Sequence, residues 1–231
     1  MSNKFGALTD HFSLASDDLV LVDSSEVPVA QDRTDAQDEN GDITASAFHG
    51  NTDGDLKEVS CTYALKSGSL NLNTLYLGEL ETGLVATSLE ASTSNTEWPQ
   101  ITISGTKGVE DVCNPDSAGT RFQLPNITLQ GCKRAQIMGF TVGDNCKLTG
   151  SSLSASIELA QQEDGEGEPV AHGVSGGTYE VSADFVGITA SPSWTVTLAG
   201  LTETQTPGSA EGQAAWHTGS GTAAGTLTRT V

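Results

Sequence analysis

One run of residues in this chain has the spacing of a catalytic site. The run GVSGG at 173–177 matches the pattern G-x-S-x-G, and Asp184 and His217 follow Ser175 in the order of an α/β-hydrolase triad. Such a nucleophile elbow requires a strand before the serine and a helix after it. Residues 178–185 instead alternate like a strand, so a glycine-rich hairpin turn explains the run better. No catalytic residue is therefore assigned.

Metal chemistry has equally little support in the residue spacing. An EF-hand loop needs oxygen ligands at positions one, three and five before a glycine at six. Counting back from Gly41 places Ala36 at position one, and counting back from Gly54 places His49 there. The histidines show no ligand spacing, and no C-x-x-C pair occurs. We assign no metal and no cofactor, and irregular calcium binding to the acidic loops stays open beside a merely solvated role.

Charge is the strongest compositional feature. The 231 residues include 30 Asp or Glu and 10 Lys or Arg, a formal net charge of −20. Residues 1–60 hold 13 of the acidic and 3 of the basic residues. Such a field repels phosphate and argues against tight nucleic-acid binding, but it suits a protein that lets nucleic acid pass without sticking. A generally acidic, soluble protein is the plain alternative.

The densest acidic segment is residues 31–42, QDRTDAQDENGD. So many carboxylates could not be buried unpaired, so the segment is expected on the surface as a long loop or the tip of a hairpin. Its carboxylates are the candidate residues for assembly or for lining a channel: Asp32, Asp35, Asp38, Glu39 and Asp42.

The elements that would position these residues are strands. In the stretch 83–105, residues Val85, Thr87, Leu89 and Ala91 alternate with polar ones, and Ile101 and Ile103 do so after a polar turn. Alternation with period two between turn residues predicts a β-hairpin, here closed at each end by glycine.

Similar stretches follow one another along the chain. Residues 19–22 predict a buried strand, a short helix is conceivable near 109–113, and 148–159 repeats the alternation. The run Ser152–Ser156 echoes Ser88–Ser92 at a spacing of 64 residues, which would fit a duplication or chance. The prediction is an all-β sandwich or barrel-forming domain over 1–231 with at most one or two short helices, an N-terminal arm (1–18) and a C-terminal arm (about 202–231).

Signals for export or membrane insertion are not visible. The first twelve residues lack an apolar core, and no window approaches the roughly 20 apolar residues of a membrane span. The four cysteines are irregularly spaced and are expected to be reduced: Cys61, Cys113, Cys132 and Cys146.

In overall texture the chain resembles the tail tube (major tail) proteins of tailed bacteriophages. The stretch 83–105, the run EPVAH at 168–172 and the run GGTYEV at 176–181 carry this similarity. The resemblance implies a cofactor-free β-sandwich that self-assembles into stacked hexameric rings. It also implies a virion location after synthesis in the host cytoplasm, contacts with other tail proteins, and an acidic lumen through which DNA passes unbound.

Two other classes share much of this texture. A capsid decoration protein would also be β-rich and acidic. A carbohydrate-binding β-sandwich would need a stacking platform, for which Trp98, Trp194 and Trp216 are the candidates, although a lone Trp more often packs in a core.

Overall fold

A computed structural model shows an all-β chain, which confirms the predicted fold class. It describes residues 8–30, 32–49, 55–81, 83–109, 112–113, 119–131, 140–142, 146–163, 169–187, 194–196, 202–209 and 217–230. Within these ranges the only helical element is one 3₁₀ turn, η1 (Leu72–Thr74).

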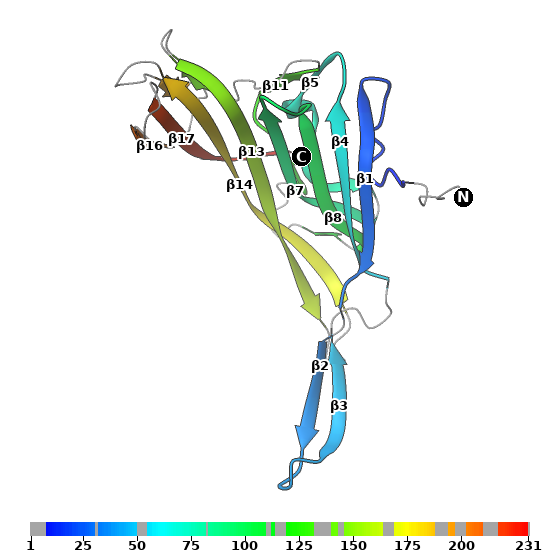
Figure 1. Ribbon diagram of the computed structural model, residues 1–231. Coiled ribbons are helices and arrows are strands. Elements are labelled where there is room, and N and C mark those ends of the chain that lie inside the picture. Colours follow the sequence, from blue (N-terminus) through cyan, green and yellow to red (C-terminus); the bar gives the residue numbers. More distant parts are fainter. Residues whose placement is uncertain are drawn as a thin grey trace, which may run out of the picture.

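Eight strands form the backbone of one large sheet, and each pairs antiparallel with its neighbour. Figure 1 shows β1 at one side of this sheet and β16 at the other, with β13 and β14 as a long curved ribbon between them. In spatial order the strands are β1 (Leu19–Pro28), β4 (Lys57–Leu65), β8 (Gln100–Val109), β7 (Gly83–Ser94), β13 (Cys146–Glu163), β14 (Pro169–Gly187), β17 (His217–Thr226) and β16 (Thr202–Ser209).

Shorter elements complete the fold. β6 pairs with both β7 and β10, β10 pairs with β18, and β9 runs parallel to β14, while β5 with β11 and β12 with β15 form two-stranded pairs. Their bounds are β5 (Ser69–Asn71), β6 (Tyr76–Glu81), β9 (Val112–Cys113), β10 (Arg121–Gln123), β11 (Thr128–Gln130), β12 (Phe140–Val142), β15 (Trp194–Val196) and β18 (Thr228–Thr230).

One apolar core joins the large sheet to the short elements. Alternate residues of β4 point into it, with Tyr63 and Cys61 fully buried. Leu72 of η1 and Leu77 of β6 belong to the same core and are equally inaccessible. Burying such a leucine contributes about 2 kcal/mol, so this alternation is what fixes the register of the strands.

The hairpin predicted over 83–105 is β7 and β8, and its pattern holds with one exception. Val85, Leu89 and Ala91 are buried, but Thr87 is only half-buried because the register shifts between Ala86 and Ser88. Gly105 does not close the hairpin, because β8 continues to Val109; a Cβ there would lie 2.3 Å from the Val85 carbonyl oxygen. The glycine permits close approach of the two strands at the bulge.

The two similar sequence runs are direct partners. Ser88–Ser92 of β7 lies antiparallel beside Ser152–Ser156 of β13, with Glu90 opposite Ser154. A local two-fold relation therefore superposes each run on the other in the middle of the sheet.

Three other expectations need correction. The run GVSGG lies inside β14 as a bulge, with Gly176 and Gly177 at φ of 70° and 117°, rather than at a hairpin turn. Residues 19–22 do begin a strand, but only one side of it is buried: Leu19 belongs to the core, whereas Val20 and Val22 are 38% and 46% exposed because β1 is an edge strand. No helix forms at Val109 or at Val112–Cys113, which belong to β8 and β9; residues 110–111 lie outside the description.

The terminal segments are also more integrated than arms. The described part of 202–231 forms β16, β17 and β18, because backbone pairing with β14 and β10 continues the sheet. At the N-terminus, residues 8–18 lie against β1 and β4, where Phe12 is buried and Asp10 accepts a 2.5 Å hydrogen bond from the Tyr63 hydroxyl. Residues 1–7 are not described.

Candidate functional site

The geometry of the GVSGG run does not assemble a nucleophilic triad. Ser175 is exposed, and its hydroxyl donates a weak 3.4 Å hydrogen bond to Glu158. Asp184 lies nine residues further along the same strand, about 30 Å away at 3.3 Å per residue. His217 begins β17 opposite Gly187, beyond Asp184. Because β14 continues after the serine, no helix N-terminus is present to form an elbow.

The acidic segment 31–42 belongs to a hairpin that extends from the body of the molecule (Figure 1). Its first half is β2 (Asp32–Gln37), which pairs with β3 (Ile43–His49) and with no other described strand. The segment is thus one arm and the tip of a hairpin, the second of the two predicted alternatives. Six residues of strand give it a reach of roughly 20 Å.

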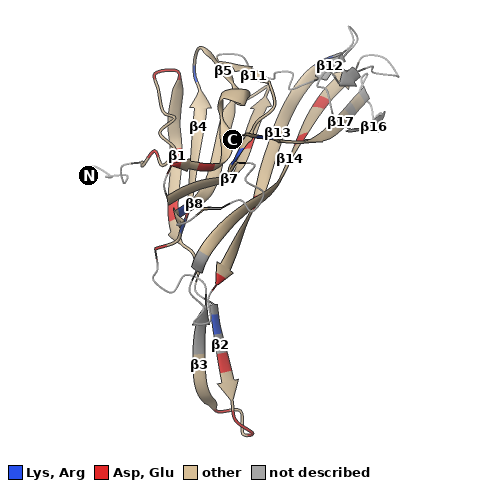
Figure 2. Cartoon of the chain, turned by 180° about the vertical axis from the view of Figure 1, so that it is seen from behind, with Lys and Arg blue, Asp and Glu red and all other residues tan. Residues whose placement is uncertain are grey.

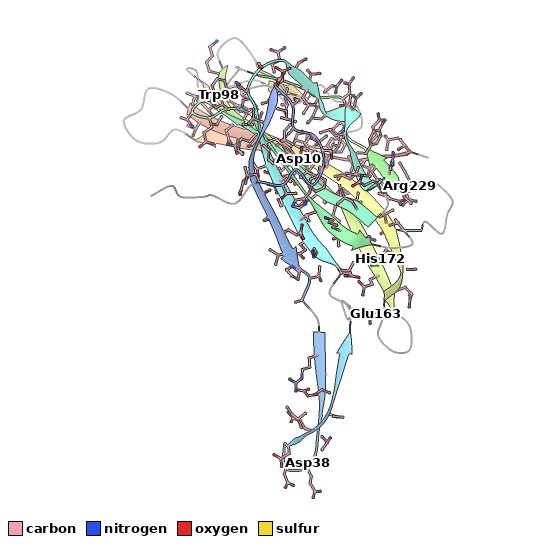
Figure 3. The ribbon with its side chains drawn as sticks, turned by 90° about the vertical axis from the view of Figure 1, so that its right-hand side faces the viewer. Asp10, Asp38, Trp98, Glu163, His172 and Arg229 are labelled. Carbon is pink, nitrogen blue, oxygen red and sulfur yellow. The ribbon has the colours of Figure 1, made fainter. Side chains whose placement is uncertain are left out.

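Two of the candidate carboxylates are used within the hairpin itself. Asp35 accepts hydrogen bonds of 2.6 Å from both Arg33 and Ser46. Asp38 accepts from the backbone N–H of Asn40 and Asp42, and these bonds hold its pKa below the ordinary value. Figure 3 shows Asp38 at the far tip.

The remaining candidates are placed by the same turn. Glu39 and Asp42 are exposed beside Asp38, and Asp32 begins β2. Asp38 thus stabilises the turn with its side-chain oxygen, as aspartate commonly does in turns. No group of three or more His, Cys, Asp or Glu is placed to hold a metal ion in the described ranges.

Sequence reasoning missed a larger feature, a hydroxyl-covered face on the side of the sheet opposite the core. Residues of successive strands that lie opposite one another on this face form rows, because each antiparallel pair is in register. One row is made entirely of serine and threonine from seven strands: Ser25, Ser60, Ser104, Ser88, Ser156, Thr178 and Thr226.

Hydrogen bonds between strands tie this hydroxyl face together. Thr62 and Thr102 bond at 3.0 Å, and Ser104 donates to Ser60 at 3.1 Å. Ser152 and Ser182 bond at 2.7 Å on the neighbouring ribbon. A shallow groove of about 320 Å³ crosses the face beside the β7 bulge, lined partly by Ser60 and Ser104.

Carboxylates are spread among these hydroxyls, and basic groups are scarce. Lys147 is the one lysine or arginine that the alternation puts on this face in the described parts of β4, β7, β8, β13 and β14. Figure 2 shows Asp and Glu along the long strands and at the hairpin tip. The exposed carboxylates that these five strands contribute to the face are Glu58, Glu90, Glu158, Glu180 and Asp184.

The sequence could indicate only a small part of this face. Because Ser88, Glu90 and Ser92 alternate with apolar residues, it predicts that these three side chains lie together on the polar side of one strand. The rows could not be indicated, because they depend on which strands are neighbours and in what register.

Aromatic residues give little support to a stacking platform. Trp98 is 54% exposed at the turn between β7 and β8 (Figure 3). Trp216 and the side chain of Trp194 lie outside what the structure describes.

Comparisons with known proteins do not add a family. No protein-family model and no curated protein matches the chain. In the described ranges, no helix has the length and apolar character needed to span a membrane.

Proposed function

We propose that this protein is a structural subunit of a bacteriophage tail tube, which assembles into stacked rings around a channel for DNA. The observation that carries the proposal is the hydroxyl face: a wide, open sheet whose solvent side combines short hydroxyls with carboxylates. As the lining of the channel, this face would offer DNA hydrogen-bonding groups but almost no cationic side chain to pair with the DNA phosphates. Binding that depends on releasing counterions from phosphate would therefore not occur.

The same sheet has an architecture suited to assembly. Its path ends in two edge strands, which are a liability in a monomer and are removed when copies close into a ring or barrel. The β2–β3 hairpin reaches beyond the body and supplies an element that could contact a neighbouring ring. These features favour a tube subunit over a carbohydrate-binding module, for which one exposed Trp98 is weak support.

Electron microscopy of the purified protein in negative stain tests the proposal. We expect rings or long tubes of constant diameter at high protein concentration. Compact trimers without a central channel would instead favour the capsid decoration class. A protein that stays monomeric at millimolar concentration would overturn the proposal.

DNA provides a second readout. In a gel-shift titration at 50 mM salt, the assembled protein should leave double-stranded DNA unshifted, as the anionic face predicts. A shift at micromolar protein that salt abolishes would contradict the assignment of this face to the channel.

A further inference from the structure

The two edge strands of the large sheet, β1 and β16, indicate how copies of the chain could join. Where the structure describes the chain, β1 pairs with β4 alone and β16 pairs with β17 alone. Each therefore leaves backbone N–H and C=O groups open along the sheet edge, apart from Leu19 of β1, whose N–H and C=O are hydrogen-bonded to Ser16. An open edge is a template for another strand.

The edge of β1 has little of the usual protection against such pairing, because its charged residues are Asp23 and Glu26, and Glu26 is already paired with Lys57. No lysine or arginine occurs in LVLVDSSEVP, and its proline is the last residue. Three of its valines are exposed: Val20 at 38%, Val22 at 46% and Val27 at 54%. Exposed valines on an edge without lysine or arginine are typical of a strand that is covered in the assembled state.

The topology fixes the relative direction of the two edges. The path from β1 to β16 contains eight strands, and every neighbouring pair is antiparallel. Strand direction alternates along such a path, so the first and eighth strands run in opposite directions. A copy related by rotation about an axis along the strands would thus present its β16 antiparallel to β1 of its neighbour.

We infer that the subunit seam of the proposed tube is an antiparallel ladder between β1 of one copy and β16 of the next. This inference rests on the proposed function and names the strands that carry it out. The joint keeps the antiparallel pairing found along the eight-strand path. It also keeps the hydroxyl face on one side of the continuous sheet and leaves no free edge in a closed ring.

A two-fold contact is the alternative that the seam must be distinguished from. Two copies could pair β1 with β1, which is also antiparallel and self-complementary. That contact leaves both β16 edges open, whereas the β1–β16 contact is heterologous and continues around a ring.

Disulfide trapping in the full-length protein tests the seam. Ser25→Cys in the middle of β1 is combined in turn with Thr202→Cys, Thr204→Cys or Thr206→Cys, alternate positions of β16 that sample the register. Partners across an antiparallel ladder lie within the Cα separation that a disulfide requires. After mild oxidation we expect at least one combination to give a denaturant-resistant ladder of dimers, trimers and higher species.

Three controls are needed to interpret the cross-linked species. The unsubstituted protein, with its native cysteines, should not cross-link. Ser25→Cys combined with Ala224→Cys should not either, because β17 is paired on both sides by β14 and β16. Ser25→Cys alone should stay monomeric in denaturant, and covalent dimers from this variant would overturn the seam in favour of the two-fold contact.

A charge variant provides a second measurement that needs no particular register. Val27→Lys should raise the protein concentration needed for assembly about tenfold, because a lysine protects an edge from pairing. Trp98→Lys is the matched control, because Trp98 is also 54% exposed but lies at a turn. The seam is overturned if tubes form but no cysteine combination gives cross-linked species, or if tubes form normally with Val27→Lys. Either result leaves the tube proposal standing. A chain that forms no assembly at all overturns both.

Discussion

Asp10 is the residue on which the N-terminal segment depends. Its carboxylate accepts hydrogen bonds from the Tyr63 hydroxyl at 2.5 Å and from the backbone N–H of Ala15 at 2.7 Å. Partial burial raises the pKa of Asp10, but the bonds from Tyr63, Ala15, Leu14 and Phe12 together outweigh it, so the pKa lies below its ordinary value of 3.8. Burial and the bond to Asp10 also raise the pKa of Tyr63.

Asp10→Asn should destabilise the protein by about 1–2 kcal/mol at pH 7. In asparagine an NH₂ group replaces one of the two carboxylate oxygens, and this group cannot accept the hydrogen bond that Tyr63 or Ala15 donates to that oxygen. A carboxylate with a lowered folded-state pKa contributes stability above its unfolded pKa and loses it as the pH falls through the folded value. The difference between wild type and variant should thus be full above about pH 4 and shrink below it. Urea unfolding across pH 2.5–7 measures this.

The exposed Asp17 supplies the control for that experiment. Asp17→Asn should change the free energy of unfolding by less than about 0.5 kcal/mol at each pH. A stability difference for Asp10→Asn that did not vary with pH would show that packing, and not the ionised carboxylate, holds the segment.

Among the elements, the β2–β3 hairpin is the most independent. It pairs only with itself in the described chain, and its tip is ordered by Asp38 rather than by the core. The hairpin can thus be removed as a unit more cleanly than the acidic segment 31–42 alone, whose deletion would leave β3 without a partner.

Replacing residues 32–49 by a short Gly-Ser linker should leave the free energy of unfolding of the body within about 0.5 kcal/mol of wild type. Assembly should weaken, because the hairpin is the element proposed to bridge rings. Urea unfolding measures the first effect and light scattering the second. A double variant, Glu39→Gln with Asp42→Asn, keeps the hairpin but removes two of its charges. It therefore distinguishes an effect of the hairpin's charge from an effect of its backbone. Normal tubes from the deleted protein would show that the hairpin has no part in assembly.

Element type was largely predictable from sequence, whereas element partners were not. The period-two alternation of Leu153, Ala155 and Ile157 identifies a strand with one buried face, and these residues are buried in β13. Nothing local reveals that this strand lies beside β7, or that β1 lies at an edge where Val22 stays exposed. Burial depends on neighbours brought from distant parts of the chain, so edge and centre strands look alike in sequence.

The same limit explains the misread glycines. Gly177 was compatible with a turn, but its φ of 117° serves a bulge against which the Phe122 ring packs closely. The candidate carboxylates were correctly expected on the surface, since burial of unpaired charge is costly, and Asp35, Asp38, Glu39 and Asp42 are exposed. Their internal bonds depend on hairpin geometry that composition does not encode.

For the whole molecule, charge sets the conditions of assembly. Each copy carries a formal charge of −20, so neighbouring copies repel one another until salt screens them. The concentration needed for assembly should fall severalfold between about 50 mM and 500 mM NaCl, measured by light scattering. Assembly that weakened with salt would indicate that attractive ion pairs dominate the contacts.

Magnesium chloride at matched ionic strength completes this experiment. Equal effects of the two salts indicate screening alone, whereas a stronger effect of the divalent cation indicates binding to the acidic surface. Repeating the comparison with calcium addresses the alternative that the acidic loops hold that ion.

The pairing of Ser88–Ser92 with Ser152–Ser156 has a consequence for folding in crowded solution. Because the two runs differ only at Glu90 and Ser154, each can pair with the partner run of a second molecule nearly as well as with the partner run of its own chain. An incompletely folded chain would then have two almost degenerate choices, one intramolecular and one between molecules. The yield of refolding should consequently fall as protein concentration rises, through domain-swapped species that are off the pathway to the ordered assembly.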